Sequence, residues 1–295
     1  MRAATSRPRV LVVELPGGAR ARMAAERELD RRGWPTGTAP GSTDVLVLAG
    51  HVPDELTPAV DLIWDQLPGP RARARPLGPD DVVAQLEAAQ ASLRDDPQQR
   101  IDARERDREP AGSWVEDDLP LAEGDDDRDG LEMDVLVHPL GPLLDHWPGG
   151  LELRTRLHGD VVAHVEVHRP ASPAHLPAAV AAWDAVARVL ALVGDDVWAR
   201  RARAVRDQRP GPEPDGGGRR VRAHLTRLAR HHVLPHSVTD VLGRLLDERI
   251  DVSTHRLDDA ALASLLEGRD LGDVRLLVAA HAPLLATTAA GAGRG

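Results

Sequence analysis

Three side chains that could bind a metal ion alternate along one stretch of the sequence. His164, Glu166 and His168 fall at every second position of 161–168 (VVAHVEVH), and this alternation predicts a β-strand. Side chains at alternate positions of a strand point to the same face, and a His-x-His pair there can chelate zinc. The alternative is that the three form the solvent face of a half-buried strand. Its core face would then carry Ala163, Val165 and Val167.

A glycine turn offers a second possible site. Pro16, Gly17 and Gly18 follow an apolar, β-branched run at 10–15 and precede helix-forming residues at 19–32. A turn between a strand and a helix N-terminus is a natural place for an anion. This turn lacks both the G-x-G-x-x-G spacing and a G-K-S/T ending, so a purely structural tight turn is the alternative.

A single histidine occupies the position where open α/β sheets commonly bind ligands. His51 directly follows a second apolar run at 44–49, and ligands of such sheets bind outside the carboxyl ends of the strands. This makes His51 a candidate binding residue. A structural role is the alternative for a histidine without a partner motif.

The composition excludes several classes of site and partner. The 295 residues contain no Cys, so the chain can form no disulfide, thiolate metal site, cysteine nucleophile or cysteine-ligated iron–sulfur cluster. The formal net charge of -10 argues against nucleic acid as a main partner. The N-terminal residues lack the apolar region of a signal peptide, and no stretch is suited to span a membrane. We therefore expect a cytoplasmic protein.

Residues 8–94 predict an α/β domain of flavodoxin-like type with a parallel sheet. The unbroken apolar runs at 10–15 and 44–49 are typical of strands covered on both faces. Helices are expected at 19–32, 58–66 and 77–93. A solvated strand is expected at the edge of the sheet, where arginine alternates with alanine at Arg71, Arg73 and Arg75.

The rest of the chain divides into a linker and a second domain. Residues 95–130 are dense in charge and poor in apolar residues, which predicts an acidic flexible linker. Residues 131–288 predict an α+β domain with a small antiparallel sheet and a helical bundle. Strands are expected at 133–137, 151–157 and 161–168, and helices at 176–194, 195–208, 219–232, 237–249, 257–267 and 271–286. Because Phe and Tyr are absent, the core must consist of Leu, Val and Ala, with Trp34, Trp64, Trp147, Trp183 and Trp198.

Residues 44–71 resemble a segment of a known family. Their sequence is DVLVLAGHVPDELTPAVDLIWDQLPGPR. It is similar to the small, 20 kDa-type iron–sulfur subunit of NADH:ubiquinone oxidoreductase (complex I) and of the [NiFe]-hydrogenases. That family has D-V-L-I/V-V-A-G, then V-T-x-x-x-x-P-A, then Y/W-D-Q-M/L-P-x-P-R/K. With the strand and glycine turn that precede it, the resemblance covers about residues 10–71.

A weaker resemblance, over about residues 138–168, is to the large, 49 kDa-type subunit of the same complexes. Gly141-Pro142 and the later LELRTRLHGDVV at 151–162 match G-P-x-H-P-x-x-H-G-x-L-x-L-x-x-x-x-D/E-G-D/E-x-I/V. The family's two histidines fall at Leu144 and Pro148, so its quinone-facing imidazole is absent, although His146 lies between them. The chain therefore resembles a fused, shortened pair of small and large subunits.

The departures from the family determine what the resemblance implies. The family holds a tetranuclear cluster on four cysteines, and the first pair follows the first strand. Here that former cluster loop reads Leu15-Pro16-Gly17-Gly18, which implies a degenerate iron–sulfur site and no cofactor.

We expect a cluster-free structural or assembly component of a membrane-associated oxidoreductase complex. Its partners would be NADH dehydrogenase-like or hydrogenase-like subunits. It would lie in the cytoplasm or peripherally on the inner face of the plasma membrane. The alternatives are an active oxidoreductase subunit that works with redox centres held by a partner, or a protein with a His/Glu metal site.

Overall fold

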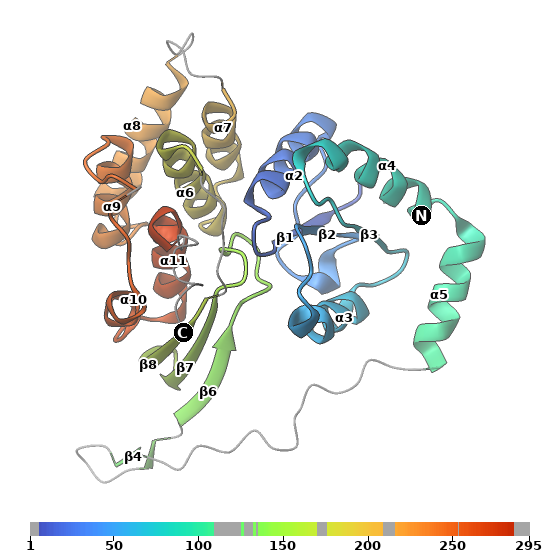
Figure 1. Cartoon of the computed structure of the whole chain (residues 1–295), viewed down its shortest axis with the longest axis horizontal. Helices are drawn as coiled ribbons and strands as arrows, with labels where there is room; N and C mark the ends of the chain where they lie inside the picture. The colour runs from blue at the N-terminus through green and yellow to red at the C-terminus, as the bar shows by residue number, and fades with distance from the viewer. Residues whose placement is uncertain are drawn as a thin grey trace, which may run out of the picture. The chain divides into compact units, whose positions relative to one another are not determined.

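The structure is a computed structural model of the chain, and it separates into two compact units (Figure 1). It describes residues 6–108, 125–126, 132–133, 135–169, 176–208, 216–252 and 254–285. Unit 1 comprises Met1–Leu119 and Pro142–Gly150, and unit 2 comprises Pro120–Gly141 and Leu151–Gly295. The loop at 142–150, which the sequence placed within the second domain, therefore packs as part of unit 1.

Unit 1 contains the predicted parallel sheet. Its strands β1 (Val10–Glu14), β2 (Val45–Ala49) and β3 (Ala72–Ala74) lie in the order β1-β2-β3. The register aligns Val10 with Val45 and Val45 with Ala72. The central strand β2 is buried at all five positions, as expected for a strand with parallel neighbours and both faces covered.

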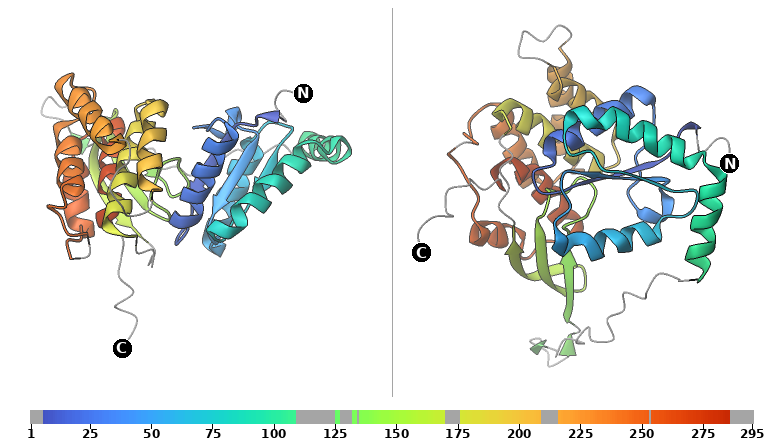
Figure 2. Two further views of the ribbon diagram at one scale, coloured as in Figure 1. Left: turned by 90° about the horizontal axis from the view of Figure 1, so that it is seen from above. Right: turned by 45° about the vertical axis from the view of Figure 1, so that its right-hand side comes forward.

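Helices cover both faces of this sheet (Figures 1 and 2). Helices α2 (Ala19–Arg32) and α4 (Val82–Leu93) lie on one face, where alternate strand residues such as Val10 and Val45 join their apolar side chains. Helix α3 (Thr57–Gln66) lies on the other face with Leu11 and Leu46. Short 3-10 turns are present at Pro40–Ser42, Asp54–Leu56 and Pro79–Asp81. The three helices predicted from the sequence are confirmed.

Helix α5 (Asp96–Arg108) corrects the linker prediction, because it occupies the first part of the segment at 95–130. Polar contacts order it rather than burial of apolar area. The side-chain amide of Gln99 accepts from the backbone N–H of Arg71 at 2.9 Å and donates to the Arg71 carbonyl at 2.9 Å. Asp102 accepts from the Arg71 guanidinium. Residues 109–124 and 127–130 of the predicted linker lie outside the described residues.

Unit 2 contains the predicted antiparallel sheet. Strands β6 (Val135–Leu140), β7 (Glu152–His158) and β8 (Val161–His168) lie in the order β6-β7-β8. A two-residue pair, β4 (Asp125–Asp126) and β5 (Glu132–Met133), precedes them. The turn between β7 and β8 contains Gly159 with φ of 65°, a conformation that favours glycine.

A β-bulge changes the predicted faces of β8. His164 pairs with Arg156, but Val162 pairs with Leu157, so Ala163 has no partner in the register. Val162 and Val165 are consequently buried, whereas Ala163 is exposed. The prediction of Ala163 as a core residue was wrong, because one extra residue in a strand shifts the alternation on one side of it.

The predicted helices of unit 2 are present, with ends that differ from the prediction by at most three residues. They are α6 (Ala178–Leu192), α7 (Asp196–Arg206), α8 (Gly217–Arg230), α9 (His236–Leu246), α10 (Asp259–Leu266) and α11 (Leu271–Leu285). Leu, Val and Ala make up most of their buried residues, as the composition required. Of the five tryptophans assigned to the core, Trp34 and Trp147 are buried and the others are half-buried. In the described part of the chain, no helix combines the length and the apolar character needed to cross a membrane.

Candidate functional site

The turn between β1 and α2 is closed by its own backbone. The N–H of Leu15 donates to the Ala49 carbonyl at 2.9 Å, and the N–H of Gly18 donates to the Leu15 carbonyl at 2.8 Å. Gly17 has φ of 75°, and a Cβ on Gly18 would lie 1.7 Å from the Ala49 oxygen. Pro16, Gly17 and Gly18 thus form a tight turn against β2. The Gly18 amide is already bonded inside this turn, and an anion site here stays a prediction.

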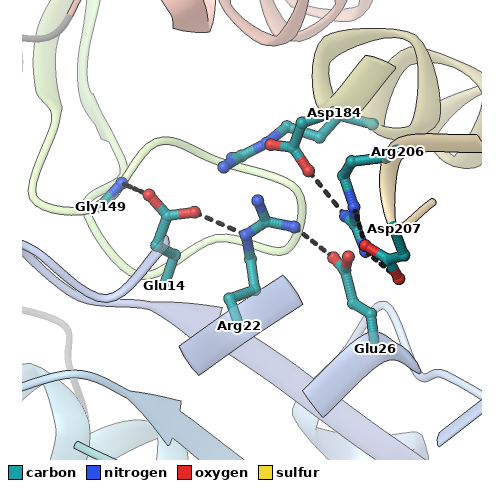
Figure 3. A network of polar contacts seen from close by, with 8 residues as sticks. Glu14, Arg22, Glu26, Gly149, Asp184, Arg206 and Asp207 are labelled. Carbon is teal, nitrogen blue, oxygen red and sulfur yellow. Dashed lines mark hydrogen bonds and ion pairs between the residues drawn. The ribbon is translucent and has the colours of Figure 1, made fainter. Parts of the chain in front are cut away.

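An arginine between two glutamates lies beside this turn (Figure 3). The Nε of Arg22 donates to Glu14 at 2.6 Å, and its Nη1 donates to Glu26 at 2.5 Å. All three residues are buried, and Arg22 is only 2% exposed. Glu14 ends β1, while Arg22 and Glu26 are one turn apart on α2. The end of the strand and the start of the helix are therefore joined by buried, charge-assisted hydrogen bonds.

The loop at 142–150 covers the same end of the sheet. Leu143 joins the apolar cluster on the α3 face of the sheet. The backbone of Asp145 forms an isolated antiparallel β-bridge with Val13, and Trp147 is 2% exposed. The N–H of Gly149 donates to the second carboxylate oxygen of Glu14 at 3.1 Å. A Cβ on Gly149 would lie 2.3 Å from the Leu15 carbonyl oxygen, so the loop backbone lies directly against the turn.

This arrangement, which we call the closed turn (residues 14–18, Arg22, Glu26 and Gly149), can stabilise the fold. A guanidinium that bridges two carboxylates satisfies charges that would otherwise be costly to bury. Both carboxylates are engaged by Arg22. What the closed turn can do is hold the β1 end, α2 and the 142–150 loop in one fixed geometry.

The structure places His51 immediately beyond β2, where the sequence predicted it. The side chain is exposed. The preceding Gly50 has φ of 114°, and its Cβ position would lie 3.0 Å from the Gly18 Cα. His51 thus follows a residue that packs against the closed turn, and a binding role for it stays a prediction.

The three predicted metal ligands on β8 lie on one exposed face. His164 and Glu166 are exposed, as is His168. The Nδ1 of His164 is 3.0 Å from an oxygen of Glu267, which also accepts from the backbone N–H of Val165 at 3.2 Å. The Nε2 of His168 is 4.0 Å from Glu166. Over the described ranges, no three His, Cys, Asp or Glu residues are grouped so that they could hold a metal ion, and the zinc site stays a prediction.

The arginines next to β3 differ from the prediction of a solvated strand. Arg71 is 5% exposed and binds Asp102 in a bidentate manner, with its Nε at 3.0 Å and its Nη2 at 2.9 Å from the carboxylate. The guanidinium carbons of Arg71 and Arg73 both lie 4.1 Å from the Trp64 ring centroid. Burial lowers the pKa of Arg73. The prediction of an edge strand is confirmed. Arg75 is exposed as expected, but Arg71 is buried and Arg73 is half-buried against Trp64.

A second buried ion cluster belongs to unit 2 and joins α6 to α7 (Figure 3). Asp184 accepts from the Nε of Arg188 at 3.0 Å and from the Nη1 of Arg206 at 2.8 Å. The Nε of Arg206 also donates to Asp207 at 2.8 Å. Two carboxylates here face two guanidinium groups, and the cluster orders the two helices.

Sequence reasoning missed the residues that close the turn. The spacing of Arg22 and Glu26 by four residues indicates a helical ion pair, and that signal was available. Glu14, by contrast, is a carboxylate at the end of an apolar run, and nothing local indicates that a helix arginine reaches it. Gly149 is 135 residues away from Glu14, so only the tertiary structure could bring them together.

Comparison with known proteins gives one partial similarity. No family model matches the chain. The B subunit of the NADH-quinone oxidoreductase of Aquifex aeolicus (strain VF5) is 42% identical over 48 residues, which is 16% of this chain and 27% of that protein. The match thus spans about a quarter of the relative's length. It supports the resemblance to the 20 kDa-type subunit of complex I.

The residues of the closed turn do not fit an iron–sulfur cluster. The sequence has no Cys, and the cluster family anchors its first thiolates at this turn. The backbone of Gly149 packs directly against Leu15 at this turn. We therefore derive no electron-transfer step for this chain.

Proposed function

We propose that this protein is a cluster-free relative of the small subunit of complex I and the hydrogenases. In this proposal it is a structural or assembly component of a membrane-associated oxidoreductase complex, bound through NADH dehydrogenase-like or hydrogenase-like subunits on the cytoplasmic side. It holds no cofactor. Its flavodoxin-like unit 1 serves as the structural frame. The acidic segment after α5 connects this unit to the rest of the chain.

The closed turn is the observation that carries this proposal. The glycines between β1 and α2 are kept, but Arg22 and two glutamates occupy the adjoining space with buried ion pairs. A fold that has exchanged a redox centre for ion pairs retains its shape and so its capacity to dock. It loses the group that would carry electrons.

The position of the 142–150 loop supports the idea of two fused subunits. This loop lies in the segment that resembles the large subunit, yet it packs as part of unit 1. Its contacts are made with the turn that resembles the cluster loop of the small subunit. Such packing is what a covalent union of two partner subunits would preserve.

Affinity purification of the tagged full chain from solubilised native membranes tests the proposal. We expect subunits of a dehydrogenase- or hydrogenase-type complex to copurify, identified by mass spectrometry, without stoichiometric iron or zinc on this chain. A solitary protein with stoichiometric zinc would overturn the proposal in favour of the metal-binding alternative.

The catalytic alternative is tested in a strain that lacks the protein. Complementation with His164→Ala should restore both the assembled complex on a native gel and its turnover. An assembled complex without turnover would instead favour an active subunit, with His164 close to its chemistry. Arg154→Ala, on the same exposed sheet face, is the matched control.

A further inference from the structure

Helix α8 has one buried apolar face and one face made of arginine. Val221 and Leu225 are fully or almost fully buried. At 3.6 residues per turn, four exposed arginines lie on the opposite side of the helix, within an arc of about 100°. We call Arg219, Arg220, Arg227 and Arg230 the α8 arginine face.

Among the described residues, these four arginines differ from their neighbours in having no carboxylate partner. The nearby Arg222 pairs with Asp247 at 2.7 Å, and Arg244 on α9 is 3.8 Å from Asp240. Within the parts of the chain that the structure describes, no ion pair is formed by the α8 arginine face. Helix α8 itself contains no Asp or Glu.

Helix stability accounts for only half of this pattern, because Arg227 and Arg230 lie in the last turn, where the helix dipole favours cations. Arg219 and Arg220 lie in the first turn, where the helix dipole favours acidic side chains and disfavours basic ones. Arg227 and Arg230 are spaced three apart and repel each other. The whole chain carries a net charge of -10, so four cations gathered on one face of a helix are an exception that suits an anionic partner.

We propose that the α8 arginine face binds the anionic headgroups of a lipid bilayer. Guanidinium groups bind phosphate oxygens in a bidentate manner. The residues between the arginines on this face, Ala223 and Thr226, are short, so the face is a ridge of cations that suits a flat layer of charge. Val233, just beyond the helix, is 49% exposed, an apolar side chain beside basic ones as in membrane-surface helices. This proposal does not rest on the proposed function.

Vesicle co-sedimentation of the full chain tests the proposal. We expect binding to phosphatidylcholine vesicles that contain phosphatidylglycerol, reduced by salt, and no binding to phosphatidylcholine alone. Each arginine near an anionic surface strengthens binding about fivefold. The variant R219Q/R220Q/R227Q/R230Q should therefore bind at least about a hundredfold more weakly. Glutamine keeps the helix propensity of arginine.

The matched control removes the same charge from unit 1. Arg27, Arg94, Arg100 and Arg104 are exposed, and R27Q/R94Q/R100Q/R104Q should bind vesicles almost as the wild type does. Circular dichroism verifies that both variants are folded. The proposal is overturned if the wild type does not bind anionic vesicles, or if the two variants lose binding equally. Retention on an acidic polypeptide resin without vesicle binding would likewise reject lipid in favour of an acidic protein partner.

Discussion

Replacing Gly149 by alanine should loosen the closed turn. The added Cβ would lie 2.3 Å from the Leu15 oxygen, whereas real Cβ contacts stay above 3.0 Å, so the two backbones must separate by about 0.7 Å. The hydrogen bond from Gly149 to Glu14, already 3.1 Å long, would then break. A hydrogen bond to a charged group contributes about 1.5–3 kcal/mol. With the strain on neighbouring packing, we expect the free energy of unfolding to fall by about 2–4 kcal/mol.

Urea unfolding followed by circular dichroism and tryptophan fluorescence measures this loss. Gly41→Ala is the control, because no atom lies within 4 Å of its Cβ position, and it should stay within about 0.5 kcal/mol of the wild type. Glu14→Gln removes the charge that Gly149 contacts. The effects of Gly149→Ala and Glu14→Gln should therefore be coupled by about 1 kcal/mol in a double-mutant cycle. A Gly149→Ala protein as stable as the wild type, or strictly additive effects, would refute the reasoning.

Three further predictions concern other buried or paired charges. Asp102→Ala leaves the buried Arg71 with only the exposed Asp65, 3.9 Å away, as a carboxylate partner. It should therefore cost about 3 kcal/mol and abolish amide-exchange protection of α5. Replacing the exposed Glu105 by Gln should do neither. Hydrogen bonds from two arginines on its own helix lower the pKa of Glu28 to about 2. The ionised Glu28 carboxylate therefore stabilises the fold fully above its unfolded-state pKa near 4.5. This contribution to the free energy of unfolding, about 1 kcal/mol after solvent screening, is lost as the pH falls towards 2. Glu28→Gln should remove this part of the acid dependence. Burial lowers the pKa of His281 below 6.5, so the unfolded chain binds the proton first and stability should drop as the pH falls below 6.5. In His281→Met, the free energy of unfolding should differ less between pH 7.5 and pH 5.5 than it does in the wild type. An unchanged difference would contradict this assignment.

The exchange of a metal cluster for ion pairs would explain two features together. The resemblance to a small subunit of complex I covers a short part of the chain, and the partial match to the Aquifex protein is equally short. Both are compatible with a frame that keeps its strands and turns while its former site changes. Arg22 and its two glutamates can fill such a space because each buried charge has a partner of opposite sign.

Local patterns were sufficient for most of the elements, and for a parallel sheet with helices in unit 1 and an antiparallel sheet with helices in unit 2. Apolar β-branched runs ended by glycine predicted β1 and β2, and the helix-forming stretch before Gly33 predicted α2. Gly33 itself ends that helix with φ of 65°. These features depend on neighbours within a few residues, because backbone propensity and side-chain periodicity are local properties.

The linker prediction was wrong over residues 96–108, for a physical reason that the composition does not reveal. Composition measures how much apolar area a segment can bury, and by that measure residues 96–108 should not be ordered. Helix α5 is instead ordered by Gln99 and Asp102, which satisfy the backbone and guanidinium of Arg71. Such contacts depend on where a distant side chain lies, and composition carries no such information.

The absence of cysteine, the charge balance and the order of strands and helices were determined by the sequence alone, because each follows from residue type or local pattern. Only the tertiary structure decided that the 142–150 loop belongs to unit 1, that Glu14 binds both Arg22 and Gly149, and that Ala163 lies in a bulge. The first two features join residues far apart in the chain. The third depends on a shift of one residue in the strand register. Their free energy comes from burial and from charge pairing in three dimensions, which no window of sequence contains.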